Sequence, residues 1–80
     1  MDHYVMLTVK NQEGNKLFFK VKGDQKLKKL LLAYCKKQIL PYGAVQFLIN
    51  GERFDHNLTP IQAELKDGDE IDAMVHASGG

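Results

Sequence analysis

The chain has 80 residues, enough for one compact domain with a thin margin of stability and too few for a second domain. Its 44% apolar and 26% charged residues lie close to globular averages, which excludes disordered, collagen-like and membrane classes. The net charge is only +1, but residues 1–40 carry +6 and residues 41–80 carry −5, so the chain presents either two docking surfaces of opposite sign or one well-mixed solvated surface.

The first elements in chain order form a predicted hairpin. Residues 4–9 alternate between an apolar and a mixed face, which is typical of a half-buried strand. Residues 11–15 supply turn chemistry, and residues 16–22 alternate again. The two apolar faces consist of Val5, Leu7, Val9, Leu17, Phe19 and Val21.

A helix is predicted over Leu27 to Gln38. Gly23 and Asp24 break the strand pattern, and Asp24 is the expected N-cap. Helical spacing gathers an apolar arc, and Pro41 closes the helix region. The arc consists of Leu27, Leu30, Leu31, Tyr34, Cys35 and Gln38.

The second half of the chain predicts shorter elements. Residues 45–49 form a strand that turns at Asn50-Gly51, a strong hairpin signal, into residues 52–54. Thr59 and Pro60 are expected to cap and begin a short helical turn, and residues 71–75 make the last strand. This order predicts an α+β protein of the β-grasp class, with a mixed sheet of four to five strands packed on one main helix plus a short helix.

We expect one domain at residues 4–76, between an N-terminal stub at 1–3 and a flexible tail at 77–80. The longest apolar run, from Leu30 to Cys35, has six residues, far short of the roughly 20 that cross a bilayer. No stretch resembles a signal peptide. Because the single cysteine cannot close an intrachain disulfide, we expect an intracellular protein of the nucleus and cytoplasm.

Short motifs along nearly the whole chain carry a family resemblance. They are Phe18-Phe19-Lys20-Val21-Lys22, Leu27-Lys28-Lys29-Leu30, Ala33-Tyr34-Cys35, Gln38, Asn50-Gly51, Thr59-Pro60, Asp67-Gly68-Asp69-Glu70-Ile71-Asp72-Ala73-Met74 and Gly79-Gly80. Their joint order and spacing resemble the small ubiquitin-like modifier (SUMO) family, most of all its plant members. Ubiquitin is less similar, because residues 76–78 replace its arginine-rich approach to the two glycines.

The resemblance implies that the protein acts through Gly79 and Gly80. Two residues without side chains let the backbone pass through narrow enzyme channels and leave the terminal carboxyl open. By resemblance, a SUMO activating enzyme adenylates the Gly80 carboxylate with ATP, thioesters carry it onward to a conjugating enzyme, and a target-protein lysine takes it as an isopeptide. The alternative is an ordinary C-terminus that contains two glycines.

The resemblance also implies the class of partners. Besides the activating and conjugating enzymes and target lysines, these are ligases, SUMO-specific cysteine proteases and proteins with SUMO-interaction motifs. We expect no cofactor, no direct nucleic acid, no membrane and a monomer. The longer polar N-terminal arm that is typical of the family is absent from this sequence.

A groove for interaction motifs is expected between the second strand and the helix. An extended partner strand would pair with the sheet edge and insert aliphatic side chains, and nearby lysines would meet its acidic or phosphorylated residues. The alternative is that the apolar members belong to the core alone. The expected groove residues are Leu17, Phe19, Lys20, Val21, Lys22, Lys29, Leu30, Tyr34 and Lys37.

An acidic surface is expected, by resemblance, to dock the conjugating enzyme. The alternative is that these acidic residues only keep the turn soluble. Two departures from the family bear on these sites: Lys66 replaces an acidic residue, and Gly23-Asp24 replaces a more basic or hydroxylated pair beside the groove. The expected docking residues are Asn50, Gly51, Glu64, Asp67 and Asp69.

The residues favour a modifier over an enzyme. Cys35 lies on the apolar arc and is expected to be an inert buried thiol, and the three histidines lack metal-ligand spacing, so we expect no metal site. Residues 21–24 loosely match an acceptor site for SUMO itself. Two other functions stay open: a non-conjugated ubiquitin-like binding domain, and a nucleic-acid binder that uses the lysine-rich half.

Overall fold

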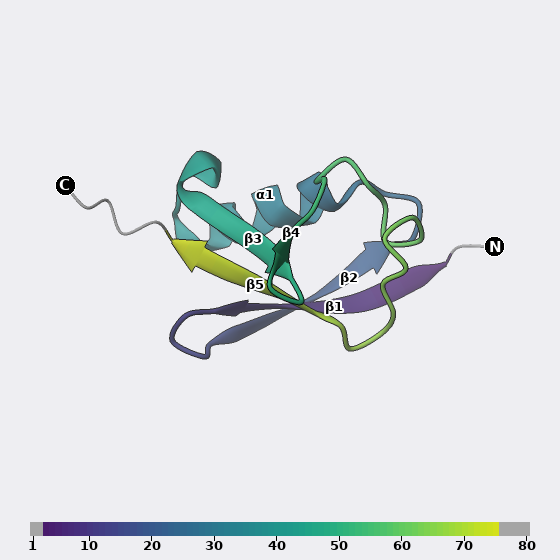
Figure 1. Cartoon of the computed structure of the whole chain (residues 1–80), viewed down its shortest axis with the longest axis horizontal. Coiled ribbons are helices and arrows are strands. Elements are labelled where there is room, and N and C mark those ends of the chain that lie inside the picture. The colour runs from purple at the N-terminus through teal and green to yellow at the C-terminus, as the bar shows by residue number, and fades with distance from the viewer. Residues whose placement is uncertain (1–2, 76–80) are drawn as a thin grey trace.

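The computed structural model describes residues 3–75 of the chain. Within them one sheet has the strand order β2-β1-β5-β3-β4, and a single α-helix lies across one face of it (Figure 1). β1 and β5 pair in parallel while the other neighbours are antiparallel, so the sheet is mixed and the predicted β-grasp class is confirmed. The elements are β1 (Tyr4–Asn11), β2 (Lys16–Lys22), α1 (Leu27–Gln38), the 3-10 helix η1 (Tyr42–Ala44), β3 (Val45–Ile49), β4 (Glu52–Arg53) and β5 (Glu70–Val75).

The core lies between α1 and the sheet, where the two predicted periodicities meet. Val5, Leu7 and Val9 of β1 are buried on one face because successive side chains of a strand point to opposite faces, and Thr8 is also buried. The predicted arc of α1 is buried from Leu27 to Cys35. Gln38 is exposed, contrary to the prediction, because it borders an open hollow at the end of the helix. Phe47 of β3 is buried under the helix, with its ring edge-on to Tyr34.

Helix α1 begins without the cap that the sequence predicts. The N-cap residue is Lys26, which makes no side-chain hydrogen bond to the helix, so the assignment of Asp24 is wrong. The N–H groups of Leu27 and Lys28 instead donate to the carbonyl oxygens of Leu58 and His56, both at 2.8 Å. These carbonyls satisfy the free donors of the first turn, which is the role a side-chain cap would have had.

The segment after Thr59 is capped as predicted but forms hydrogen-bonded turns in place of a helix. Thr59 Oγ1 accepts from the Gln62 N–H at 3.1 Å, and Gln62 Oε1 accepts from the Thr59 N–H at 2.9 Å. The segment stops after one turn because Glu64 takes the left-handed conformation, with φ of 56°. The short helix of the described residues is η1, which the sequence did not predict.

The turn between β3 and β4 confirms the hairpin signal at Asn50-Gly51. Both residues have positive φ, 54° and 79°, as a two-residue type I′ turn requires. Strand boundaries differ from the prediction by one or two residues. β1 continues to Asn11, and β5 begins at Glu70.

Ile39 ends α1 in a conformation that suits its residue type poorly. Its φ of 56° and ψ of 48° are left-handed, and its side chain is 90% exposed. A β-branched residue there is strained, whereas glycine is the usual choice. We therefore expect Ile39→Gly to raise the free energy of unfolding by about 1 kcal/mol, because strain is relieved and almost no packing is lost.

Denaturant unfolding of Ile39→Gly and Leu32→Gly checks this expectation. Leu32 is also an exposed aliphatic residue, but it lies inside α1. There glycine should lower the free energy of unfolding by about 1 kcal/mol. A loss of stability in both variants would contradict the strain at Ile39.

Candidate functional site

A groove lies between β2 and α1 at one edge of the sheet. Among the described strands β2 pairs only with β1, so its outer backbone row is available to an extended peptide. The groove has a volume of about 160 Å³. Its lining residues are Phe19, Lys20, Val21, Gln25, Lys29, Leu30 and Ala33.

The groove contains five of its nine predicted residues. Gln25 and Ala33 line it without having been predicted, although helical spacing places Ala33 on the face of Lys29 and Leu30. Tyr34 is buried instead, and burial raises the pKa of its hydroxyl, with Cys35 contributing. The other predicted residues that do not line the groove are Leu17, Lys22 and Lys37.

The two lysines of the groove differ in where their charge lies. The Lys20 ammonium lies 4.6 Å from the centre of the Tyr4 ring, so it is held by a cation–π contact with a β1 residue that does not line the groove. Lys29 is exposed on α1, where it can meet an acidic group of a partner lying along β2. Lys29 is therefore the better-placed charge of the groove.

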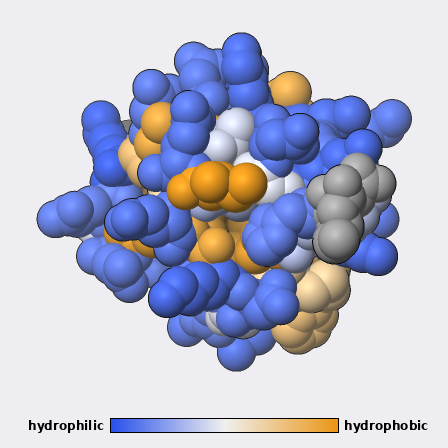
Figure 2. Space-filling model, turned by 90° about the vertical axis from the view of Figure 1, so that its right-hand side faces the viewer, coloured by the Kyte–Doolittle hydropathy of each residue, from blue (hydrophilic) through white to orange (hydrophobic). Residues whose placement is uncertain are grey.

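The tight space around Gly23 accounts for one residue of the Gly23-Asp24 pair, which departs from the family pattern beside the groove. A Cβ atom there would lie 2.8 Å from His3 Cδ2 and 2.9 Å from Ile61 Cδ1, so a larger residue would displace both side chains. Ile61 itself is 57% exposed at the end of the molecule where β1 begins. Figure 2 shows that end, with apolar atoms surrounded by hydrophilic ones. Val21 is buried, so the acceptor pattern of residues 21–24 lacks an accessible apolar side chain.

An acidic hollow of about 300 Å³ lies beside the turn that follows β3. It brings together Asn50, Glu64 and Asp69 of the predicted docking set. Glu70, which follows Asp69 in the predicted acidic turn, also lines it. Its carboxylate is 3.0 Å from the Lys16 ammonium, and this hydrogen-bonded ion pair holds the pKa of Glu70 below its usual range. The remaining lining residues are Ile49, Ala63 and Leu65.

Two predicted docking residues lie apart from the hollow. Gly51 belongs to the neighbouring turn and does not line it. Asp67 accepts a hydrogen bond from the Met6 N–H through Oδ1 at 2.8 Å. The Gly68 N–H donates to the Met6 carbonyl at 2.9 Å, so the loop is fastened to β1 on both sides of that residue. Asp67 therefore has a structural role.

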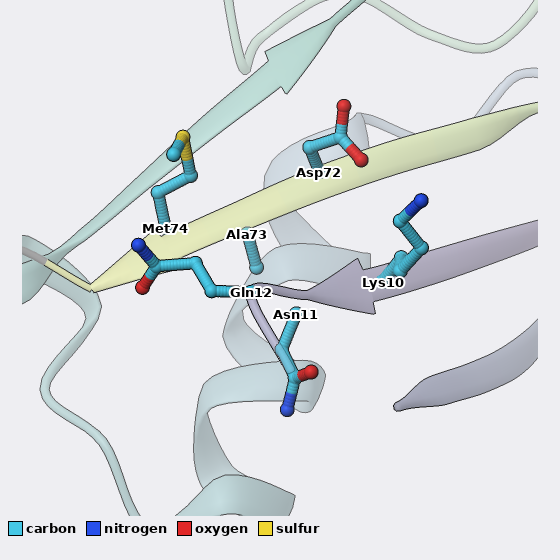
Figure 3. Close-up of a pocket in the computed structure, with 6 residues that line it drawn as sticks. All are labelled: Lys10, Asn11, Gln12, Asp72, Ala73 and Met74. Atoms are coloured by element: carbon cyan, nitrogen blue, oxygen red, sulfur yellow. The ribbon is translucent and has the colours of Figure 1, made fainter. Parts of the chain in front are cut away.

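The root of the C-terminal tail is the third region of interest. Gly79 and Gly80 lie outside the described residues, which end at Val75 of β5. A hollow of about 190 Å³ opens between the ends of β1 and β5 (Figure 3). It is lined by Lys10, Asn11, Gln12, Asp72, Ala73 and Met74.

Cys35, the single cysteine of the sequence, lies in the core. Cys35 is 3% exposed, and burial raises the pKa of its thiol, which disfavours the reactive thiolate. Within residues 3–75 no group of three or more His, Cys, Asp or Glu side chains is placed to hold a metal ion. No helix in that range has the length and apolar character that would let it span a membrane.

The family model and the curated relatives agree on one protein family. A family model described as "Ubiquitin-2 like Rad60 SUMO-like" matches residues 5–75. Small ubiquitin-related modifier 2 of Arabidopsis thaliana is 46% identical over 77 residues, 96% of this chain and 75% of that protein. Small ubiquitin-related modifier 3 of the same plant is 42% identical over 96% of this chain and 69% of that protein. The ubiquitin-like protein pmt3/smt3 of Schizosaccharomyces pombe is 35% identical, over 96% and 66% respectively.

Solved structures support the fold independently of close sequence similarity. The ubiquitin of Caldiarchaeum subterraneum superposes with a TM-score of 0.87 over 98% of this chain and 100% of that one, at 16% sequence identity. A protein designed on the basis of ubiquitin superposes with a TM-score of 0.77 at 18% identity, over 95% of this chain and 93% of that one.

Two acidic residues of the predicted docking set should differ in how much their side chains stabilise the fold. We expect Asp67→Ala to lower the free energy of unfolding by about 1 kcal/mol, because the Met6 N–H loses its acceptor. Glu64→Ala should change it by less than about 0.5 kcal/mol, because Glu64 is exposed and its backbone conformation is kept. Urea unfolding of both variants measures the difference, and equal losses would contradict the division of roles.

Proposed function

Since the chain belongs to the SUMO family of small ubiquitin-related modifiers, and is a modifier rather than an enzyme, we propose that it is attached through Gly80 to lysines of other proteins. The observation that carries the proposal is a SUMO-like domain over residues 5–75 followed, within five residues of the last strand, by Gly79-Gly80. That spacing supports a reactive end held clear of the folded body.

The chemistry takes place on other proteins, and the chain supplies one carboxylate. An oxygen of the Gly80 carboxylate, free or freed by a cysteine protease, attacks the α-phosphorus of ATP, and pyrophosphate leaves. A thiolate of the activating enzyme then displaces AMP to form a thioester, and a thiolate of the conjugating enzyme takes the acyl group in turn. A lysine amine attacks the thioester, loses a proton and forms the isopeptide as the thiol leaves.

The length of the tail fits this role. The five residues after Val75 span at most about 17 Å when extended, enough to enter an active site while the folded domain stays outside. The glycines at its end have no side chains to obstruct a narrow channel. A family of modifiers implies a conjugation pathway with enzymes and targets, and ligases and SUMO-specific proteases complete the proposed set of partners.

The groove beside β2 is proposed to bind SUMO-interaction motifs of other proteins. A short aliphatic strand would add to the free edge of β2 and place side chains over Phe19, Val21 and Leu30. Acidic residues flanking that strand would meet the exposed Lys29. The proposed partner therefore combines aliphatic and acidic residues.

The acidic hollow is proposed to dock a basic surface of the conjugating enzyme through Glu64 and Asp69. Lys66, which is exposed nearby in the chain, opposes this attraction. We also propose that the protein acts as a monomer in the nucleus and cytoplasm, without direct contact to nucleic acid or membrane. The single buried cysteine supports an intracellular site of action.

Gly80→Ala tests the conjugation directly. Wild type, incubated with SUMO activating and conjugating enzymes, ATP and a protein substrate rich in lysine, should give an ATP-dependent ladder on a denaturing gel. Gly80→Ala should abolish or strongly reduce it, because a methyl group obstructs the channel around the reacting carboxyl.

Gly43→Ala is the matched control, because a Cβ atom at Gly43 would have no heavy atom within 4 Å. This variant should conjugate like wild type. Equal ladders from wild type and Gly80→Ala, or none from wild type, would contradict the proposal and leave a ubiquitin-like binding module.

Charge reversal at Lys29 tests the groove. The probe is a synthetic peptide of four aliphatic residues followed by three acidic ones, titrated while binding is followed by fluorescence anisotropy. Lys29→Glu should raise Kd about tenfold at low salt, with a smaller difference at high salt. Lys36→Glu makes the same charge change on α1 outside the groove lining and should leave Kd within about twofold. An equal effect of both variants would argue against the groove.

A further inference from the structure

Gln12 continues the hydrogen bonding of the sheet after β1 has ended. The last register pair between β1 and β5 joins Asn11 and Ala73. β5 runs two residues further, to Val75, whereas the segment after β1 turns back toward β2. The Val75 N–H then donates to Oε1 of Gln12 at 3.2 Å. A side-chain carbonyl thus takes the place that a strand carbonyl would occupy in a longer β1.

The hairpin turn itself prepares Gln12 for this contact. Asn11 Oδ1 accepts hydrogen bonds from the N–H groups of Glu13 and Asn15, both at 2.9 Å. The Asn11 N–H donates to the Asn15 carbonyl, also at 2.9 Å. The residues on both sides of Gln12 are therefore held, and Figure 3 shows its amide extending from the end of β1 toward the end of β5.

Val75 is held from two sides at the point where the described chain ends. On one side β5 pairs with β3, where Val45 and Val75 are in register. On the other side its N–H donates to the side chain of Gln12. The Gly80 carboxylate lies five residues beyond this point in the sequence.

Open hollows flank Gln12 on both faces of the sheet. One contains Lys10, Asp72 and Met74 (Figure 3), and the other contains Tyr34 and Leu40 on the side of α1. Gln12 lines both hollows. A protein that binds the tail can thus contact both faces of the sheet near Val75, and Gln12 lies between the two hollows.

We propose that Gln12 is a positioning residue: its side-chain carbonyl fixes the Val75 backbone and thereby the direction in which the tail leaves the sheet. This inference rests on the proposed conjugation through Gly80. An enzyme that holds the folded domain and the tail together must receive the tail along one path. A root fixed before binding lowers the ordering cost of that encounter. Because the hydrogen bond is exposed, its loss should change populations by a factor of about five.

Gln12→Leu and Gln12→Glu separate the acceptor from the bulk of the side chain. Leucine has a similar size but no acceptor, whereas glutamate keeps an oxygen at the same reach. Hydrogen exchange of the Val75 amide is followed by NMR, and initial rates of thioester formation on a SUMO activating enzyme give KM and kcat. We expect Gln12→Leu to speed exchange about fivefold and to lower kcat/KM about fivefold, mainly through KM. Gln12→Glu should stay close to wild type in both.

Each other outcome overturns the inference. An unchanged exchange rate of the Val75 amide in Gln12→Leu would show that the hydrogen bond does not fix Val75. Faster exchange with unchanged kcat/KM would show that fixing Val75 does not help the enzyme to bind the tail. Equal impairment of both variants would assign the effect to something other than the acceptor. Absence of any thioester from wild type would instead remove the proposed function, and the positioning role with it. Denaturant midpoints of the three proteins identify a general loss of stability.

Discussion

The parallel pairing of β1 with β5 is the constraint on which the remaining architecture depends. The first and last strands lie side by side in the centre of the sheet, and parallel neighbours require a long connection between them. That connection contains β2, α1, η1, β3 and β4. Its helix α1 buries its apolar side chains against the sheet, where Leu7 and Ile71 are fully enclosed. Because β1 and β5 run in the same direction, β5 finishes at the end of the molecule opposite to the start of β1 (Figure 1).

The same strand order keeps the candidate surfaces separate. The groove borders the edge strand β2, and the acidic hollow borders β3 and its turn. The hollow at the root of the tail lies where β5 extends beyond the end of β1. No residue lines more than one of these three regions. The uneven charge of the two halves of the sequence reappears here, since the groove draws its lysines from residues 1–40 and the hollow its acids from residues 41–80. The ion pair of Lys16 with Glu70 joins the halves across the sheet.

Sequence reasoning succeeded where a feature depends on local spacing and failed where it depends on a distant partner. Alternation and helical periodicity act within a few residues, so the bounds of α1 and the buried face of β1 were predicted correctly. The carbonyl acceptors for the start of α1 come from a loop some thirty residues away, which no local motif reveals. Asp67 was assigned to a docking surface by resemblance to the family. Its hydrogen bond to Met6, 61 residues earlier, adds a structural role that no local motif reveals.

The burial of Cys35 bears on the chemistry that the family resemblance implies. A modifier that travels as a thioester is open to attack by any thiolate nearby, including one of its own. The single thiol of this chain lies under α1 in the core, and burial raises its pKa, so both access and ionisation oppose such an attack. Packing of the helix on the sheet therefore does more than stabilise the fold. It also removes the thiol of Cys35 from solvent.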